Sequence, residues 1–167
     1  MEWLTGILHE ATARIAPEYF LLPVHGGPSV YRERVYCYEL YHQMRLLWPG
    51  DCPYRINGEV DKRAHPYFRE GGEPKPDLLV HEPGSGNNYC VIEVKSCRAS
   101  DAGIEKDMET LTRFTKEIGY PRAVYLIYGE EAAELMATIE KHAAAVQAPI
   151  EVWLHPAPGQ PAHCINH

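Results

Sequence analysis

Two acidic residues and a lysine stand out in the middle of this sequence, because each belongs to a stretch that is otherwise apolar. Asp77 opens the run Pro76-Asp77-Leu78-Leu79-Val80, and fifteen residues separate it from Glu93-Val94-Lys95, which ends a β-rich stretch. Side chains two positions apart in a strand point to the same face, so Glu93 and Lys95 are expected side by side on a sheet. Such a charged pair is costly to bury without partners, which favours a functional role.

The loop between the two stretches supplies a reason for them to meet. Residues 82–88 include the turn sequence Gly-Ser-Gly-Asn-Asn, so the flanking strands can pair as neighbours. Asp77 and Glu93 would then share one end of a hairpin, where carboxylate oxygens suit Mg²⁺. A Mg²⁺ ion in that place supplies a bound hydroxide and a Lewis acid. Lys95 would orient or help deprotonate the water and stabilise phosphoryl charge, so the set predicts metal-dependent phosphodiester hydrolysis.

The elements that must position these residues follow from hydrophobic periodicity and from Pro/Gly punctuation. Helices are predicted at 31–47, 101–118 and 130–147, and strands at 54–62, 78–81, 89–95, 123–128 and 150–154. Three successive strands indicate a meander, and the later strand-helix-strand units indicate parallel pairing. We therefore expect an α/β fold with a mixed central sheet flanked by helices, in the order α-β-β-β-α-β-α-β. The domain spans 1–154, and the Pro-rich segment 155–167 is expected to be a loose tail.

These motifs and their order resemble the PD-(D/E)xK nuclease superfamily, which includes restriction endonucleases and Holliday-junction resolvases. The resemblance covers 31–128 and implies a restriction-endonuclease-like fold and a nuclease that depends on Mg²⁺ or Mn²⁺. It implies that Asp77, Glu93 and Lys95 are the catalytic residues. Many members carry a further acidic ligand in the first helix, and the resemblance places it at Glu39, in Tyr38-Glu39-Leu40-Tyr41-His42-Gln43. The implied metal ligands are Glu39, Asp77 and Glu93.

Plainer interpretations of the same residues stay open. Glu93 and Lys95 would form an ion pair if their strand face were exposed, and Asp77 is a common turn residue after proline. Glu39 would then be an ordinary glutamate on a helix surface. Glu59 is either a further metal or water contact or a solvent-facing residue of its strand.

Two other groups have side chains that contact nucleic acids in some proteins. Tyr36, Tyr38 and Tyr41 could stack on nucleobases, although tyrosines at helical spacing more often belong to a core or an interface. The helix at 101–118 mixes both signs of charge, which favours a solvated face. Its charged residues include Glu105, Lys106, Asp107, Glu109, Arg113, Lys116 and Glu117.

Composition narrows the class of protein. The 167 residues carry a formal net charge of −7, which argues against a protein whose whole surface grips nucleic acid. No apolar run approaches the ~18 residues of a membrane span, and the first residues do not read as a signal peptide, so we expect a cytoplasmic protein. The five cysteines have no CxxC spacing, which predicts free, mostly buried thiols and makes a zinc site a weak alternative.

Taken together, the sequence predicts a Mg²⁺-dependent nuclease, with nucleic acid as partner, DNA or RNA undecided, and a homodimer or a protein partner possible. The alternative is a non-catalytic restriction-endonuclease-like module that binds nucleic acid or a protein. A third interpretation is an unrelated α/β interaction protein in which the motif is chance. Metal binding separates the first interpretation from the other two.

Overall fold

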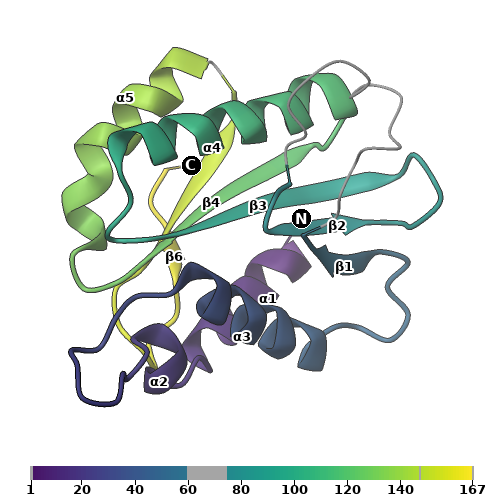
Figure 1. The fold of residues 1–167 in the computed structure, drawn as a ribbon. Coiled ribbons are helices and arrows are strands. Elements are labelled where there is room, and N and C mark those ends of the chain that lie inside the picture. The colour runs from purple at the N-terminus through teal and green to yellow at the C-terminus, as the bar shows by residue number, and fades with distance from the viewer. Residues whose placement is uncertain (1, 60–74, 147, 167) are drawn as a thin grey trace.

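A six-stranded mixed sheet runs through the middle of the protein, as the computed structural model in Figure 1 shows for residues 2–59, 75–146 and 148–166. Its spatial order follows the sequence from β1 to β6. The strands are β1 (Arg55–Gly58), β2 (Leu78–His81), β3 (Asn88–Ser96), β4 (Arg122–Tyr128), β5 (Ile150–His155) and β6 (His163–Cys164).

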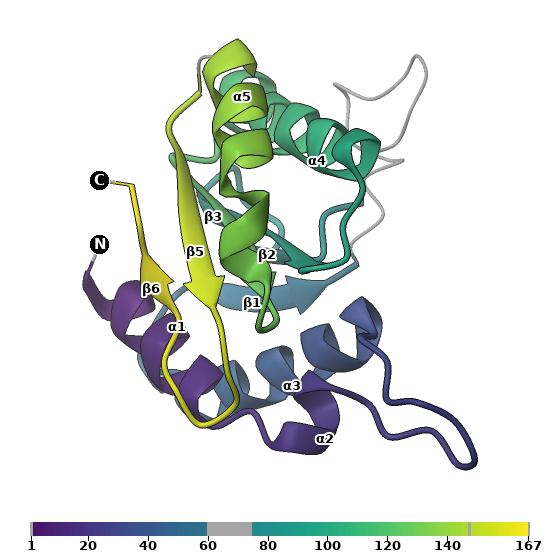
Figure 2. The same cartoon turned by 90° about the vertical axis from the view of Figure 1, so that its left-hand side faces the viewer.

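Helices cover both faces of this sheet and make three layers (Figures 1 and 2). The first three helices lie on one face, and the last two lie on the other. They are α1 (Glu2–Ala13), α2 (Pro17–Phe20), α3 (Glu33–Leu46), α4 (Asp101–Arg113) and α5 (Met136–Val146). A π-helical turn at Phe114–Ile118 extends α4, and a 3₁₀ turn at Ala132–Leu135 precedes α5.

Strand directions match the sequence-based prediction. β1, β2 and β3 form an antiparallel meander, whereas β3, β4 and β5 are parallel and are connected through α4 and α5. The predicted α/β fold with a mixed sheet is therefore confirmed. The predicted strand at 54–62 is observed as β1 only as far as Gly58, and its last three residues lie outside the described ones.

The central strands are buried on both sides, as their apolar sequences predict. On β3, Ile92 and Val94 face the core beneath α1 and α3, whereas Val91 faces the core beneath α4 and α5. Every residue of β4 is buried. The alternation along β3 therefore directs Glu93 and Lys95 toward the α4 face of the sheet.

The two ends of the chain differ from the prediction. Helix α1 was not anticipated, and its Leu4 and Leu8 are buried in the core that α3 also covers. The segment expected to be a loose tail instead adds β6, which pairs antiparallel with β5. Beyond β6, the Asn166 side chain bonds to the backbone of β5 as a further strand would. It accepts a hydrogen bond from the Val152 amide and donates one to the Ile150 carbonyl. Short side-chain caps of this kind leave no periodic signal in a sequence.

Two predictions from composition can also be checked. All five cysteines are free, and three of them, Cys37, Cys90 and Cys97, are buried, as expected. Among residues 2–59, 75–146 and 148–166, no helix is long and apolar enough to cross a bilayer.

A buried histidine makes the fold sensitive to acid. His155 lies under Phe20, and its Nδ1 is 2.7 Å from the Tyr36 hydroxyl. Burial lowers the pKa of His155 to about 4, whereas an unfolded chain leaves it near 6.5. Between these values the unfolded state binds more protons, so stability is present above pH 6.5 and is lost as the pH falls toward 4.

The first prediction follows from this loss of stability at low pH. Between pH 7 and pH 4 the parent protein should lose more unfolding free energy than His155→Gln, which keeps a polar partner for Tyr36 but cannot be protonated. The excess loss should be up to about 3 kcal/mol, at roughly 1.4 kcal/mol per pKa unit. Urea denaturation at several pH values measures it. Parallel pH curves for the two proteins would show that His155 does not titrate on unfolding.

Candidate functional site

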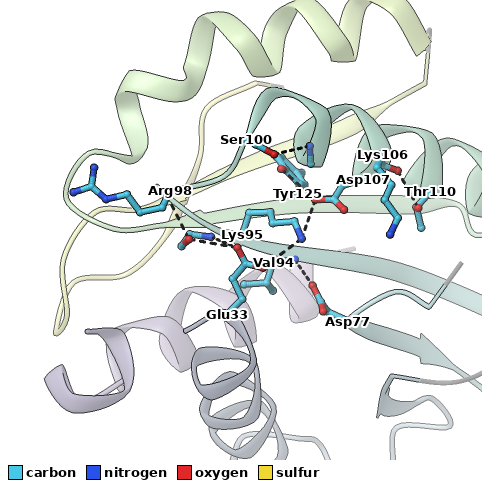
Figure 3. Close-up of polar contacts among 12 residues, drawn as sticks. Glu33, Asp77, Val94, Lys95, Arg98, Ser100, Lys106, Asp107, Thr110 and Tyr125 are labelled. Atoms are coloured by element: carbon cyan, nitrogen blue, oxygen red, sulfur yellow. Dashed lines mark hydrogen bonds and ion pairs between the residues drawn. The ribbon is translucent and has the colours of Figure 1, made fainter. Parts of the chain in front are cut away.

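Strand β3 continues past the end of its neighbour β2, and carboxylates cap the edge that is left unpaired. The ladder between these strands ends at the pair Leu78 and Ile92, whereas β3 continues to Ser96. Asp77 Oδ2 accepts a 2.7 Å hydrogen bond from the Val94 amide. Glu33 Oε1, from the first turn of α3, lies 3.3 Å from both the amide and the hydroxyl of Ser96 (Figure 3).

Asp77 and Glu93 meet at this edge, as the sequence predicts. Glu93 is only 5% exposed, and burial followed by the charges of Asp77 and Asp107 raises its pKa well above the usual value. Burial also raises the pKa of Asp77, although the Val94 amide opposes the shift. The nearby carboxylates thus add to the effect of burial, because like charges disfavour the ionisation of Glu93.

Lys95 lies between carboxylates from two different layers of the molecule. Its Nζ is 3.3 Å from Glu33 Oε2, on the α3 side, and 3.5 Å from Asp107 Oδ2, on α4 (Figure 3). The Tyr125 hydroxyl, from β4, donates to the same Asp107 oxygen over 3.4 Å. The ammonium is thus held in position from both faces of the sheet.

The charges of this cluster do not balance. Four carboxyl groups, on Glu33, Asp77, Glu93 and Asp107, surround the ammonium of Lys95. Burial acts to lower the pKa of Lys95, but these four groups outweigh it and raise that pKa above its usual value. Burial raises the pKa of Asp107 to about 6, even though Lys95 opposes the change. The cluster therefore favours additional positive charge, which protons or a cation can supply.

A cavity of about 600 Å³ opens beside the cluster. Asp77 lines it, together with Glu33 and Cys37 of α3 and with residues at the end of β1. Burial, followed by the charges of Asp77 and Glu93, raises the pKa of Cys37 well above normal, so this thiol stays protonated and is a poor nucleophile. Asp77 and Glu33 are the lining residues that connect the cavity to the cluster around Lys95.

The carboxylates fit a magnesium ion better than a softer metal. Mg²⁺ is usually held by one or two carboxylates, with water and substrate oxygens completing its shell. Asp77 and Glu93 provide that pair, and their raised pKa values show that extra positive charge between them is favourable. Within the described part of the chain, no three His, Cys, Asp or Glu side chains are grouped as a ready-made metal site. The arrangement therefore suits an ion that keeps several of its waters.

The acidic residue that α3 contributes is Glu33, and not Glu39. Glu39 lies six positions after Glu33, so it points about 120° away around the helix axis. Its Oε1 accepts a 2.6 Å hydrogen bond from Gln43, on the side of α3 away from the cavity. The structure therefore does not bring Glu39 to the cluster with Asp77 and Glu93.

The sequence analysis did not predict the positions of two other acidic residues, Asp107 and Glu59, correctly or in full. Asp107 was assigned to a solvated helix face, but it is buried against Lys95 and Tyr125. Its spacing from Ile104 and Leu111 could have shown this, because i+3 and i−4 positions share the apolar stripe of α4. Glu59 lines the cavity and pairs with Arg34 over 3.1 Å, so it belongs to the rim.

Comparison with known proteins does not identify a family for this chain. No family model, curated protein or solved structure matches this chain.

The second prediction concerns the cap on β3. Asp77→Asn keeps an oxygen for the Val94 amide, whereas Asp77→Ala leaves that buried N–H without its partner. In EDTA, Asp77→Ala should be less stable than Asp77→Asn by about 1–3 kcal/mol, the usual penalty for an unsatisfied buried group. Urea denaturation compares the two variants. Equal stabilities would mean that the cap contributes nothing to the fold.

Proposed function

We propose that this protein is a Mg²⁺- or Mn²⁺-dependent nuclease with a restriction-endonuclease-like fold, of the PD-(D/E)xK type. One observation carries the proposal: the carboxyl groups of Asp77 and Glu93 lie near each other and near Lys95, and Asp77 lines a cavity there. A strand that served only as structure would gain nothing from concentrating these charges, because buried like charges destabilise the fold. The meander, the crossover through α4 and the strand order support the fold assignment.

The residues divide the chemistry among them. Asp77 and Glu93 would hold a divalent ion, which would supply Lewis acidity and make a bound water more acidic. Lys95, whose pKa is raised, stays protonated at neutral pH and acts as a hydrogen-bond donor rather than as a base. It can orient the attacking water and neutralise charge on the phosphoryl oxygens. Glu33 and Asp107 restrict the ammonium to one position, so little reorganisation is needed during the reaction.

The third prediction tests the activity. With Mg²⁺ or Mn²⁺ the protein should cut labelled DNA or RNA, single- or double-stranded, and EDTA should stop the cutting. Lys95→Ala should lose at least 100-fold in rate, in line with the loss of one donor to developing charge. Gel assays on all four substrates measure this effect.

The two glutamates of α3 provide a matched control for that assay. Glu33→Gln should lower the rate, because it releases one of the two carboxylates that hold Lys95, whereas Glu39→Gln should cut like the parent. Circular dichroism confirms that each variant is folded. A parent protein that cuts none of the substrates, or a Lys95→Ala variant as active as the parent, would refute the nuclease proposal and favour a non-catalytic module of the same fold.

The fourth prediction tests the metal itself, without activity as readout. A ligand that binds only the folded state raises stability by about 2.7 kcal/mol at a hundredfold excess over its dissociation constant. Millimolar Mn²⁺ or Mg²⁺ should therefore raise the melting temperature of the parent. Asp77→Asn, which lacks one charge of the repelling pair, should be at least as stable as the parent in EDTA and should gain less from the ion. Calorimetry that finds the same gain in both proteins would remove Asp77 from the metal site.

A further inference from the structure

One face of α3 carries two arginines with two tyrosines between them. Arg34, Tyr38, Tyr41 and Arg45 follow the spacing i, i+4, i+7 and i+11, which places them in one stripe along the helix. This stripe is distinct from the core stripe of Tyr36, Leu40 and Met44, which is buried beneath the sheet.

The first half of the stripe borders the cavity beside the carboxylate cluster. Arg34, Tyr38 and Tyr41 line this cavity of about 600 Å³, opposite Asn57 of β1 and close to Asp77. Tyr38 is 61% exposed, so its ring offers a face to solvent instead of packing in the core. A hollow of this size takes a small molecule or a few nucleotides, but it is too small to enclose a duplex.

The second half of the stripe borders another hollow, of about 260 Å³, which is lined by Arg45, Trp48 and Arg55. The guanidinium of Arg55 is held by the carbonyl oxygens of Cys52 and Tyr54, so its position is set before any ligand arrives. Trp48 is also held, because its Nε1 donates to Tyr54 over 3.0 Å. Among the described residues, neither arginine forms an ion pair with a carboxylate.

The two hollows lie at opposite ends of β1. Gly58 lies against Asp77, and Arg55 is three residues back along the strand, which is roughly 10 Å in an extended chain. Helix α3 runs alongside, with Tyr38 and Tyr41 toward the cluster and Arg45 toward the second hollow. Together these residues place aromatic rings and cations along α3 and β1, from the second hollow to the cavity that Asp77 lines. We call them the α3–β1 track.

We propose that the α3–β1 track binds a single-stranded polynucleotide. Backbone phosphates contact Arg45 and Arg55, unstacked bases lie on Tyr38 and Tyr41, and the next phosphate is delivered to Asp77. Grooves that bind single strands combine these two features, cations along the backbone and aromatic rings beneath the bases. This inference rests on the proposed nuclease function and names its substrate class, since bases that are paired in a duplex cannot reach the two rings.

The test measures binding in EDTA, where no metal-dependent cutting occurs. Fluorescence anisotropy of the full chain compares a labelled single-stranded DNA, the RNA of the same sequence and the matching DNA duplex. Both single strands should bind at least tenfold more tightly than the duplex, and the stronger of the two identifies the sugar. A poly-glutamate peptide should not compete, because it supplies anions without bases.

Variants then locate the binding site. Arg45→Ala combined with Arg55→Ala should weaken binding at least tenfold, and should reduce the slope of log affinity against log salt by about 1.4, or ~0.7 per lost phosphate contact. Tyr38→Ala should weaken it roughly tenfold, with Tyr38→Phe close to the parent because the ring remains. The matched control, Arg14→Ala combined with Lys141→Ala, removes one positive charge just after α1 and one from α5, and should bind normally.

Each alternative outcome overturns the inference. An equal loss in the control would mean that general charge, and not the track, attracts the strand. Equal affinities for duplex and single strand would show that the track does not select unpaired bases. Competition by poly-glutamate would show that the track binds acidic peptides instead. Failure here is distinguishable from failure of the nuclease proposal. If the parent cuts nucleic acid but the track variants bind as tightly as the parent, only the track inference is refuted. If the track variants bind more weakly but the parent never cuts, only the nuclease proposal is refuted.

Discussion

The site depends on the unpaired edge of β3 beyond Ile92. An amide that is buried without a partner costs as much as a lost hydrogen bond, so the amides of Val94 and Ser96 need acceptors that β2 does not provide. Asp77 and Glu33 supply these acceptors from two separate elements. The same two contacts bring carboxylates to the place where Glu93 and Lys95 emerge from the strand, so sheet geometry and the candidate chemistry have one cause.

Capping by carboxylates has an electrostatic consequence that the fold only partly relieves. Lys95 is a counterion within the cluster, and it is shared between Glu33 and Asp107. Burial and the charges of Asp77 and Asp107 still raise the pKa of Glu93, so the cluster favours the uptake of positive charge.

The sequence was informative where a residue contrasted with its local pattern. Glu93 and Lys95 interrupt an apolar strand, so period-two geometry predicted that they share a face. The turn residues between the two strands predicted that Asp77 and Glu93 meet. Glu33 gives no such contrast, because it stands in the first helical turn before the apolar stripe begins. Choosing Glu39 required knowing how α3 is rotated against the sheet, which tertiary packing determines. Asp107 was detectable from its spacing, but the surrounding charges of α4 concealed it.

The rotation of α3 is set by core contacts that lie next to the site. Tyr36 stacks on Tyr128 of β4 with ring centroids 3.9 Å apart, and its hydroxyl is hydrogen-bonded to His155 of β5. Both contacts lie in the core, and they determine the direction of every other face of the helix. Turning α3 by one residue, about 100°, would take Glu33 away from Ser96 and Lys95 and would bury part of the exposed stripe. One packing arrangement of aromatic residues therefore positions three features: the cap on β3, Lys95 and the α3–β1 track. These aromatic residues take no part in the proposed chemistry.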